Sequence, residues 1–409
     1  MECLDGIKKM KKRIAVVSRM ERAGGGSFQY GASILEAVTK LSQTEYEVCF
    51  WYNSNSLDDF VKRLCCQHAR PNWFSVQFFR VVRKIANIAN KVLKSTRIEN
   101  WVEYDALIRA VRSWKPDVCI SLEQTYNPLS KKMRVIGPVH DLMHRYETRF
   151  PEISAPAEFS ARERMFGRHA KYAAAVLVDS AIGKKQLIEC YGVAESKVHI
   201  LPFIPSPLLT EPADRPSSIA TINAPFIFYP AQFWPHKNHM AIIRAIAMLP
   251  EDLPLHCVFV GTTDKEAFAP VREAIEKAGL SERVHILGYV SDADVAWFYK
   301  NAFALVMATF CGPTNIPPLE AMQYGCPVVA SAVYGMPEQC GDAALYIDPR
   351  KPEQIAEALC RMATEPGLRE SLIEKGFARS AQWTKEDFQK RFLEILQSVS
   401  SAPFQASEN

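Results

Sequence analysis

The sequence predicts an α/β protein of two domains, each built on a parallel β-sheet. Short apolar runs rich in β-branched and aromatic residues alternate with helical patterns along the whole chain. A length of 409 residues exceeds what a single hydrophobic core usually holds. A Pro- and Ser-rich segment without periodicity, residues 206–218, separates two sets of such runs. We therefore expect one domain at residues 1–210 and a second at residues 211–384.

Twelve apolar runs fit buried strands. Their apolar residues follow one another without alternating with polar ones, which is typical of strands in sheets covered on both faces. The first six are Arg13–Arg19, Tyr46–Tyr52, Asp117–Leu122, Arg134–Val139, Ala174–Asp179 and Val198–Phe203. The second six are Phe226–Pro230, Leu255–Gly261, Val284–Gly288, Ala304–Ala308, Pro327–Ser331 and Ala344–Asp348. Open sheets of this kind bind ligands at the carboxyl ends of their strands, so two such domains predict a cleft that holds the site.

The bulk composition excludes several classes of protein. A formal net charge of +4 is too mild to imply nucleic-acid binding, and 48% hydrophobic residues are typical of a globular chain. The eleven cysteines are odd in number and form no CxxC pair, which argues against a disulfide framework. No run approaches the length of a membrane span and the first residues show no signal-peptide pattern, so we expect a cytoplasmic protein.

The segment Thr309–Ser331 reads as a strand end, a polar turn, a short helix, a glycine stop and another strand. Thr314 or Asn315 can cap the helix, and Gly325 suits the left-handed position after it. A helix that starts directly after a strand presents backbone N–H groups and a positive dipole end, which suit a diphosphate. Glu320, placed in the first turn, can accept hydrogen bonds from ribose hydroxyls. The alternative is that it only complements the helix dipole.

A glycine-rich stretch, ERAGGGSFQYG (residues 21–31), follows the first strand and precedes a helical pattern. Gly25 and Gly26 allow a ligand to approach the backbone closely, although a flexible turn is the alternative. The stretch does not fit GxGxxG, and no GxxxxGK(S/T) occurs in the chain. Dinucleotide dehydrogenases and P-loop ATPases therefore lose support.

Three motifs resemble those of glycosyltransferase family 4, whose members have the GT-B fold of two Rossmann-like domains. They are GPTNIPPLEA with the PVVAS that follows it (Gly312–Ser331), GMPEQCGDAALYIDP (Gly335–Pro349) and YPAQFWPHKNH (Tyr229–His239). The resemblance is strong over residues 226–385 and looser before them. It implies transfer of a sugar from a nucleotide-diphosphate donor with retention of anomeric configuration, and without a metal or other cofactor.

The resemblance also implies roles for residues of the second domain. Lys237 matches a lysine that contacts the donor diphosphate, and Glu320 matches a glutamate that holds the ribose. The backbone of Thr314, Asn315 and Ile316 matches a loop that faces the pyrophosphate and the donor sugar. Lys237 is also credible by itself, because it lies in a polar turn between an apolar strand and a helix. A solvated lysine at a helix start is the plainer alternative.

On the first domain, His140 and Asp141 match a His-Asp pair at the floor of the cleft. The resemblance places the histidine beside the anomeric centre of the donor. The neighbouring Asp141 is a candidate to orient that imidazole. It places Gly25 and Gly26 in a loop that faces the donor phosphates and the acceptor. A metal held by His140 and His144 at i, i+4 spacing is the weaker alternative, because a third ligand is missing.

Two positions depart from the family pattern. Gly312 stands eight residues before Glu320, where the family usually has a glutamate, and Gln232 stands five before Lys237, where it often has arginine. These changes remove a carboxylate and a fixed cation from the donor site. We interpret them as marks of a subgroup in which Asn315 and Thr314 read the sugar. Impaired activity is the alternative.

Two further segments predict contacts outside the cleft. Residues 77–97 form a strongly amphipathic pattern with one basic face, which is either a solvated surface or a contact with anionic lipid at the inner membrane. Lys385–Val399 fits a helix, and the resemblance implies that it crosses back onto the N-terminal domain.

Together these features predict a retaining glycosyltransferase that moves a hexose or deoxyhexose from a nucleotide sugar. The expected acceptor is a glycan or lipid-linked glycan, in surface polysaccharide biosynthesis, and we expect the protein in the cytoplasm or peripherally at the inner membrane face. Two alternatives stay open: a nucleotide-sugar epimerase of the same fold, and a catalytically impaired nucleotide-sugar-binding protein.

Overall fold

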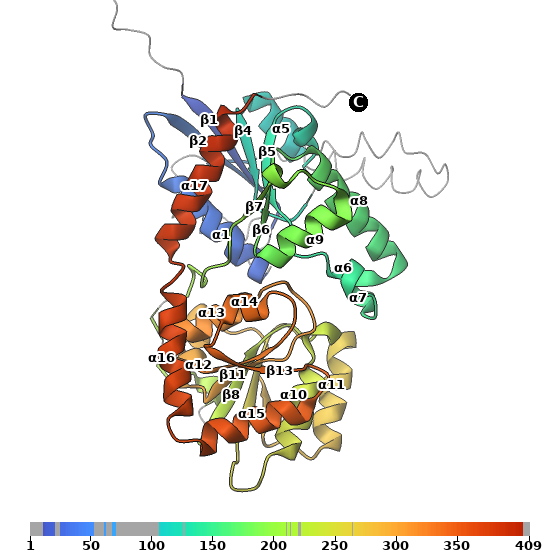
Figure 1. Cartoon of the computed structure of the whole chain (residues 1–409), viewed down its shortest axis with the longest axis vertical. Helices are drawn as coiled ribbons and strands as arrows, with labels where there is room; N and C mark the ends of the chain where they lie inside the picture. Colours follow the sequence, from blue (N-terminus) through green and yellow to red (C-terminus); the bar gives the residue numbers. More distant parts are fainter. Residues whose placement is uncertain are drawn as a thin grey trace, which may run out of the picture.

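The computed structural model shows two α/β domains, one stacked on the other (Figure 1). It describes residues 11–20, 25–52, 61–62, 68–70 and 106–403, apart from positions 126, 210, 213, 220, 221 and 264. The basic helix predicted over residues 77–97, and the lipid contact it would make, lie outside these ranges and stay predictions. Within them, no helix has both the length and the apolar character needed to cross a membrane.

The N-terminal domain holds a parallel sheet whose strands have the order β3-β2-β1-β4-β5-β6-β7. These strands are β1 (Lys12–Ser18), β2 (Tyr46–Tyr52), β3 (His68–Ala69), β4 (Val118–Ser121), β5 (Arg134–Pro138), β6 (Ala175–Val178) and β7 (Val198–Ile200). Six of them confirm predicted runs. The two-residue edge strand β3 was not predicted, because two residues are too few to show a pattern.

The C-terminal domain holds a second parallel sheet with the order β10-β9-β8-β11-β12-β13. Its strands are β8 (Phe226–Pro230), β9 (His256–Val260), β10 (Val284–Ile286), β11 (Ala304–Met307), β12 (Val328–Ser331) and β13 (Ala344–Ile347). All six confirm predicted runs. In both sheets the sequence order reverses at the centre, beside β1 and β8, and ligands of doubly wound sheets bind at such a point.

Helices cover both faces of the sheets (Figure 1). In the N-terminal domain they are α1 (Gly26–Thr39), α5 (Ala106–Trp114), α6 (Met143–Tyr146), α7 (Pro151–Ser154), α8 (Pro156–Tyr172) and α9 (Ala181–Tyr191). In the C-terminal domain they are α10 (His239–Met248), α11 (Lys265–Lys277), α12 (Asp292–Asn301), α13 (Ile316–Gln323), α14 (Met336–Cys340), α15 (Pro352–Thr364) and α16 (Leu368–Ser380). A last helix, α17 (Lys385–Ser401), ends the described chain.

The packing of strand β1 explains why its apolar residues do not alternate with polar ones. Ile14 and Val16 pack into a cluster with α1 and α17, whereas Ala15 and Val17 pack into another cluster with α5. All four side chains are at most 1% exposed. Because successive side chains of a strand point to opposite faces, both faces of this sheet lie in a core.

The chain crosses between the domains twice. At the first crossing Leu208 packs against the N-terminal core and Leu209 against the C-terminal core. At the second, between α16 and α17, the Trp383 Nε1–H donates to the carbonyl of Pro202 at 3.1 Å, which joins the two crossings. Helix α17 then lies along the N-terminal domain beside α1 (Figure 1).

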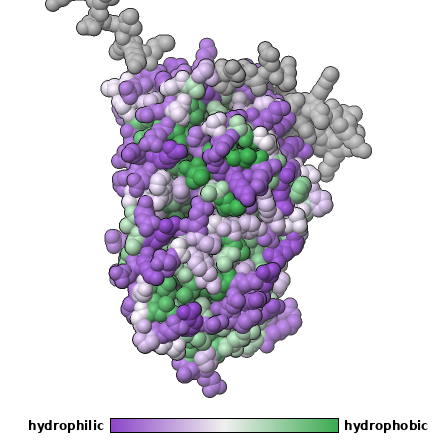
Figure 2. Space-filling view, viewed as in Figure 1, coloured by the Kyte–Doolittle hydropathy of each residue, from purple (hydrophilic) through white to green (hydrophobic). Residues whose placement is uncertain are grey.

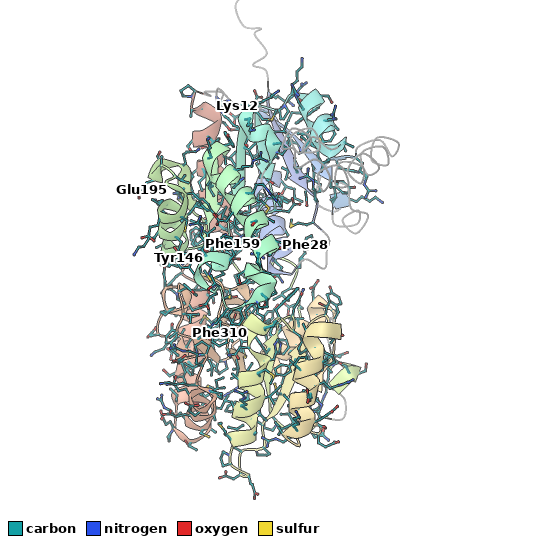
Figure 3. All side chains as sticks on the ribbon, turned by 90° about the vertical axis from the view of Figure 1, so that its right-hand side faces the viewer. Lys12, Phe28, Tyr146, Phe159, Glu195 and Phe310 are labelled. Carbon is teal, nitrogen blue, oxygen red and sulfur yellow. The ribbon has the colours of Figure 1, made fainter. Side chains whose placement is uncertain are left out.

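The short helices α6 and α7 reach from the N-terminal domain onto the C-terminal one. Met143, Phe150 and Ile153 form an apolar cluster with Cys311, and Phe310 packs against it. Figure 3 shows Phe310 just below the level where the two domains meet. On the face shown in Figure 2, hydrophilic residues cover most of both domains and hydrophobic ones form small scattered groups.

Candidate functional site

A cavity of about 910 Å³ lies between the two domains, at the carboxyl ends of the strands of both sheets. Its lining includes Asp179, Ala231 and Gly261, which directly follow β6, β8 and β9, and residues a few positions after β5 and β11. All eleven residues that the sequence singled out line it: Gly25, Gly26, His140, Asp141, Gln232, Lys237, Gly312, Thr314, Asn315, Ile316 and Glu320. Residues nearly 300 positions apart therefore meet in one site.

Helix α13 begins at Ile316 as the sequence predicts, and Gly325 after it has the expected left-handed φ of 71°. The predicted side-chain cap is wrong. Asn315 occupies the cap position, but its amide nitrogen faces the carbonyl of Cys311 and the sulfur of Met336 at 3.5 and 3.4 Å. Two of the first three helical residues are prolines, which have no N–H. The helix start keeps its dipole but offers fewer donors than expected.

Glu320 lies in the second turn of α13, not in the first as predicted. Its side chain is buried, Oε2 accepts a hydrogen bond from the Tyr299 hydroxyl at 2.8 Å, and Oε1 has no partner among the described residues. Burial raises the pKa of Glu320 to about 7, although hydrogen bonds from Tyr299 and the Ser206 backbone act to lower it. A carboxylate so far inside the helix complements the dipole poorly, which favours a ligand-binding role.

Lys237 ends a 3₁₀ turn that is held from several sides. The Tyr229 hydroxyl donates to its carbonyl at 2.8 Å, and the next residue, Asn238, donates to the carbonyls of Ala308 and Pro349 at 3.0 and 2.7 Å. Burial lowers the pKa of the Lys237 amine. No carboxylate within the described ranges pairs with it, so the amine is available to an anionic ligand.

His140 follows β5 and is 9% exposed. The Tyr30 ring meets its ring edge to face at 4.8 Å, and the Phe203 ring lies 5.5 Å away. Burial lowers the pKa of His140 to about 4, so the imidazole is neutral at cellular pH, and its Nε2 has no described partner. The Gln124 side-chain oxygen accepts from the His140 backbone N–H at 3.0 Å.

The predicted orientation of this imidazole by Asp141 is not what the structure shows. The Asp141 carboxylate accepts from the Met143 backbone N–H at 3.0 Å and lies 3.9 Å from Arg162. His144 pairs with Glu163 at 2.7 Å and shares no ligand position with His140. Aromatic packing therefore fixes the His140 ring, and the alternative of a metal held by both histidines loses its basis.

The glycine-rich loop of the N-terminal domain faces the start of α13. Gly25 has a φ of 60° and precedes α1, which begins at Gly26. A Cβ on Gly26 would lie 3.5 Å from Cδ1 of Ile316. The backbone of this loop therefore packs close to the loop proposed to bind the diphosphate.

The two departures from the family pattern have defined surroundings. Gly312 has a φ of 99°, and a Cβ there would lie 2.9 Å from the Asn315 amide nitrogen and 3.0 Å from the Thr314 carbonyl. Gln232 accepts from the Trp234 indole N–H at 2.9 Å. Trp234 is 39% exposed and lines the cavity. Gln232 therefore positions the Trp234 ring at the wall of the cavity. Arginine could not do this, because its side chain has no hydrogen-bond acceptor for the indole N–H.

Two residues that the sequence did not reveal hold the donor loop. Gln339 bonds both backbone groups of Asn315, accepting from its N–H at 2.9 Å and donating to its carbonyl at 2.6 Å. Asp179, after β6, accepts from the Thr314 N–H at 3.2 Å and from its hydroxyl. The position of Asp179 directly after a buried strand could have marked it as a candidate site residue. Nothing in the sequence around Gln339 predicts its contact with Asn315.

A third unforeseen residue is Glu152 of α7. Its Oε1 accepts from the backbone N–H of His236 at 3.0 Å and lies 2.9 Å from His236 Nδ1. The contact joins the N-terminal domain to the turn that carries Lys237. Tyr334 adds a further link between domains, because its hydroxyl donates to Glu147 at 2.8 Å.

Comparison with known protein families and proteins bears on this site. Residues 211–379 match the model of the family Glycosyl transferases group 1. O-antigen chain mannosyltransferase B of Escherichia coli is 28% identical over 167 residues, 40% of this chain and 43% of that protein. O-antigen chain mannosyltransferase RfbU of Salmonella typhimurium is 22% identical over 365 residues, 85% of this chain and 93% of that protein. The match to the first relative thus spans less than half its length.

Solved structures show the same fold. Anabaena Alr3699/HepE in complex with UDP-glucose has a TM-score of 0.69 at 14% identity, over 94% of this chain and 99% of that one. WaaG, a glycosyltransferase involved in lipopolysaccharide biosynthesis, has a TM-score of 0.65 at 16% identity, over 95% of this chain and 100% of that one. The two sheets and the cleft between them are therefore arranged as in GT-B glycosyltransferases.

Proposed function

We propose that this chain is a retaining, metal-independent glycosyltransferase that moves a hexose or deoxyhexose from a nucleotide-diphosphate sugar to a glycan or lipid-linked glycan. The observation that carries the proposal is the meeting of Lys237, Glu320 and His140 in one cavity between two parallel sheets. The two relatives named as O-antigen chain mannosyltransferases favour surface polysaccharide biosynthesis and mannose as the first sugar to test.

Each of the three residues has a distinct part in this proposal. Lys237 places a cation where negative charge develops on the departing diphosphate, and the dipole of α13 adds to it. Glu320 offers its unpartnered Oε1 to a ribose hydroxyl. The neutral His140 offers Nε2 to the sugar and the incoming hydroxyl. A preorganised contact to developing charge is typically worth about 3–4 kcal/mol in the transition state.

A catalytically impaired nucleotide-sugar binder is the second candidate, and Gly312 favours it. The backbone at this position is left-handed and its surroundings are filled by the Asn315 side chain, so the family carboxylate has no place in this loop. Such a protein would bind the donor without turning it over.

A thermal-shift screen with GDP, UDP, dTDP and ADP tests the donor site. A nucleotide at a hundred times its Kd should raise the free energy of unfolding by about 2.7 kcal/mol. We expect one nucleotide to stabilise the wild type and Lys300→Ala, which alters an exposed lysine on α12. Lys237→Ala and Glu320→Ala should lose that stabilisation. If no nucleotide acts on the wild type, or the variants respond like it, the donor site is misassigned.

Transfer of the sugar separates the two candidate functions. The nucleotide found in the screen is supplied as its sugar conjugate, GDP-mannose first, with a lipid-linked glycan acceptor. Release of the nucleoside diphosphate that depends on the acceptor supports the transferase. Tight binding of the conjugate without release supports the binder.

A further inference from the structure

Three residues that line the cavity have a buried polar atom without a hydrogen-bond partner among the described residues. These atoms are Oε1 of Glu320, Nε2 of His140 and Oε2 of Glu152. The first two belong to residues that the proposed function already assigns to the donor. Glu152 has the same property, and neither its position in the sequence nor the resemblance assigns it a role.

The Glu152 carboxylate is held in a defined place. Its side chain is only 9% exposed, and Oε1 is engaged by both the backbone N–H and the ring of His236. His236 directly precedes Lys237. The contact therefore fixes the carboxylate beside the turn that carries the proposed diphosphate lysine, and it leaves Oε2 as the free acceptor.

Oε2 of Glu152 is a hydrogen-bond acceptor on a carboxylate, so it favours a ligand that is a neutral hydrogen-bond donor. A buried acceptor left without a partner costs about 1–3 kcal/mol, so a ligand that donates a hydrogen bond relieves an existing cost. A phosphate oxygen has no proton to donate at neutral pH and is repelled by the carboxylate. Asp141 and Glu158 line the same cavity, and Glu158 is neutralised by Arg162 at 2.7 Å. A neutral polyhydroxylated group, a sugar, is the ligand that fits.

We propose that Glu152 Oε2 accepts a hydrogen bond from a hydroxyl of the transferred sugar, so that the N-terminal domain supplies the carboxylate that position 312 of the C-terminal domain lacks. The inference rests on the proposed function, because it takes the cavity to hold a sugar nucleotide. It explains how a chain with Gly312 can still grip the donor sugar. Since Glu152 reaches the sugar only while α7 lies against His236, recognition of the sugar requires the domains to be together.

Calorimetric binding of a nucleotide with and without its sugar tests this role. The probes are GDP and GDP-mannose, or UDP and UDP-glucose, whichever nucleotide the wild type binds, without an acceptor. Glu152→Gln keeps a carbonyl oxygen for His236 and replaces the free acceptor by an NH₂ group. We expect the Kd of the free nucleotide to stay within about twofold. The Kd of the sugar nucleotide should rise about tenfold to a hundredfold, as for a lost hydrogen bond to a charged group.

Tyr334→Phe is the matched control, because it removes a different link between the domains, the hydrogen bond to Glu147 at 2.8 Å. This variant should change both affinities by the same factor. The ratio of the two Kd values does not depend on the fraction of folded protein, so poor folding of Glu152→Gln cannot imitate the result. An unchanged ratio in Glu152→Gln overturns the inference while leaving the donor site intact. A wild type that binds neither probe overturns the proposed function itself.

Discussion

At the scale of single residues, Gly312 shows how the backbone shapes the donor loop. Its φ of 99° allows the chain to turn back so that the Asn315 side chain packs across it. A side chain at position 312 would meet both the Asn315 amide and the Thr314 carbonyl. The glycine is therefore a requirement of this loop and not merely a lost glutamate.

Gly312→Ala should accordingly destabilise the protein more than Gly279→Ala. Both glycines have positive φ, so each alanine costs about 1–2 kcal/mol in backbone strain. A Cβ at Gly279 meets nothing within 4 Å, whereas one at Gly312 is crowded, which adds about 1–3 kcal/mol. Urea denaturation of the two variants measures the difference. Equal losses of stability would show that the loop rearranges freely.

Sequence patterns predicted the cavity residues that stand in recognisable motifs. They did not predict the residues whose role depends on partners far away in the chain. Lys237 and Glu320 stand in motifs, next to a strand end or inside a short helix. Glu152 and Gln339 act through contacts with His236 and Asn315 that only the folded chain creates. A hydrogen bond between residues 84 positions apart leaves no pattern in the sequence.

At the scale of elements, α17 is part of the N-terminal core although it follows the C-terminal domain in the chain. Phe388 and Phe392 are fully buried there, beside Tyr30 and Phe203. A capping box between Thr384 and Asp387 starts the helix directly after the second crossing. The helix therefore fastens the crossing to the domain on which it packs.

Phe392→Ala tests this contribution against Phe377→Ala on the neighbouring helix α16. Phe392 is 0% exposed and Phe377 is 49% exposed. Truncating the buried ring should lower the free energy of unfolding by about 3–5 kcal/mol. Truncating the exposed one should cost about 1 kcal/mol or less. Thermal and urea unfolding of the pair provide the comparison, and similar losses would mean that α17 is only loosely attached.

Strands were predictable because a sheet covered by helices on both faces needs continuous apolar runs, and such runs can be recognised in the sequence. That is why both ends of twelve strands could be located to within three residues. The cap of α13 was harder to predict than its start, because Thr314 and Asn315 are good capping residues whose side chains bond Asp179 and Met336 instead. Tertiary contacts outweighed the local preference.

At the scale of the whole molecule, a buried carboxylate links the two domains. Asp179 of the N-terminal domain accepts from Thr314 of the C-terminal one and from the neighbouring Ser180. Burial raises the pKa of Asp179 to about 7, although these hydrogen bonds act to lower it. Glu320 has a pKa raised in the same way. Two carboxyl groups of the cleft thus hold protons at pH values where exposed carboxyls have lost them.

Asp179 and Glu320 should therefore each contribute a stability that falls as the pH rises from about 4 to about 7. Buried histidines with lowered pKa values, such as His140, contribute in the opposite direction, so the test compares variants with the wild type. At these two carboxyls the folded chain keeps protons that the unfolded chain releases in this window, so their contribution to the free energy of unfolding decreases with pH. Asp179→Asn should remove the Asp179 part of this decrease, so its free energy of unfolding relative to the wild type should rise between pH 5 and pH 7 by an amount on the order of a few kcal/mol. Urea denaturation at pH 5, 6, 7 and 8 measures it. Asp252→Asn, in an exposed turn, should keep the wild-type slope; a parallel slope in Asp179→Asn would contradict the assignment.

The return of α17 has a consequence for how the protein is made. A ribosome delivers the strands of the first domain long before the aromatic side chains that complete its core. The second domain, whose strands and helices are contiguous, emerges whole and can fold in the meantime. The N-terminal domain is therefore translated first, but its hydrophobic core is completed last. Until then the surface of α1 that Phe388 and Phe392 cover in the finished protein stays exposed.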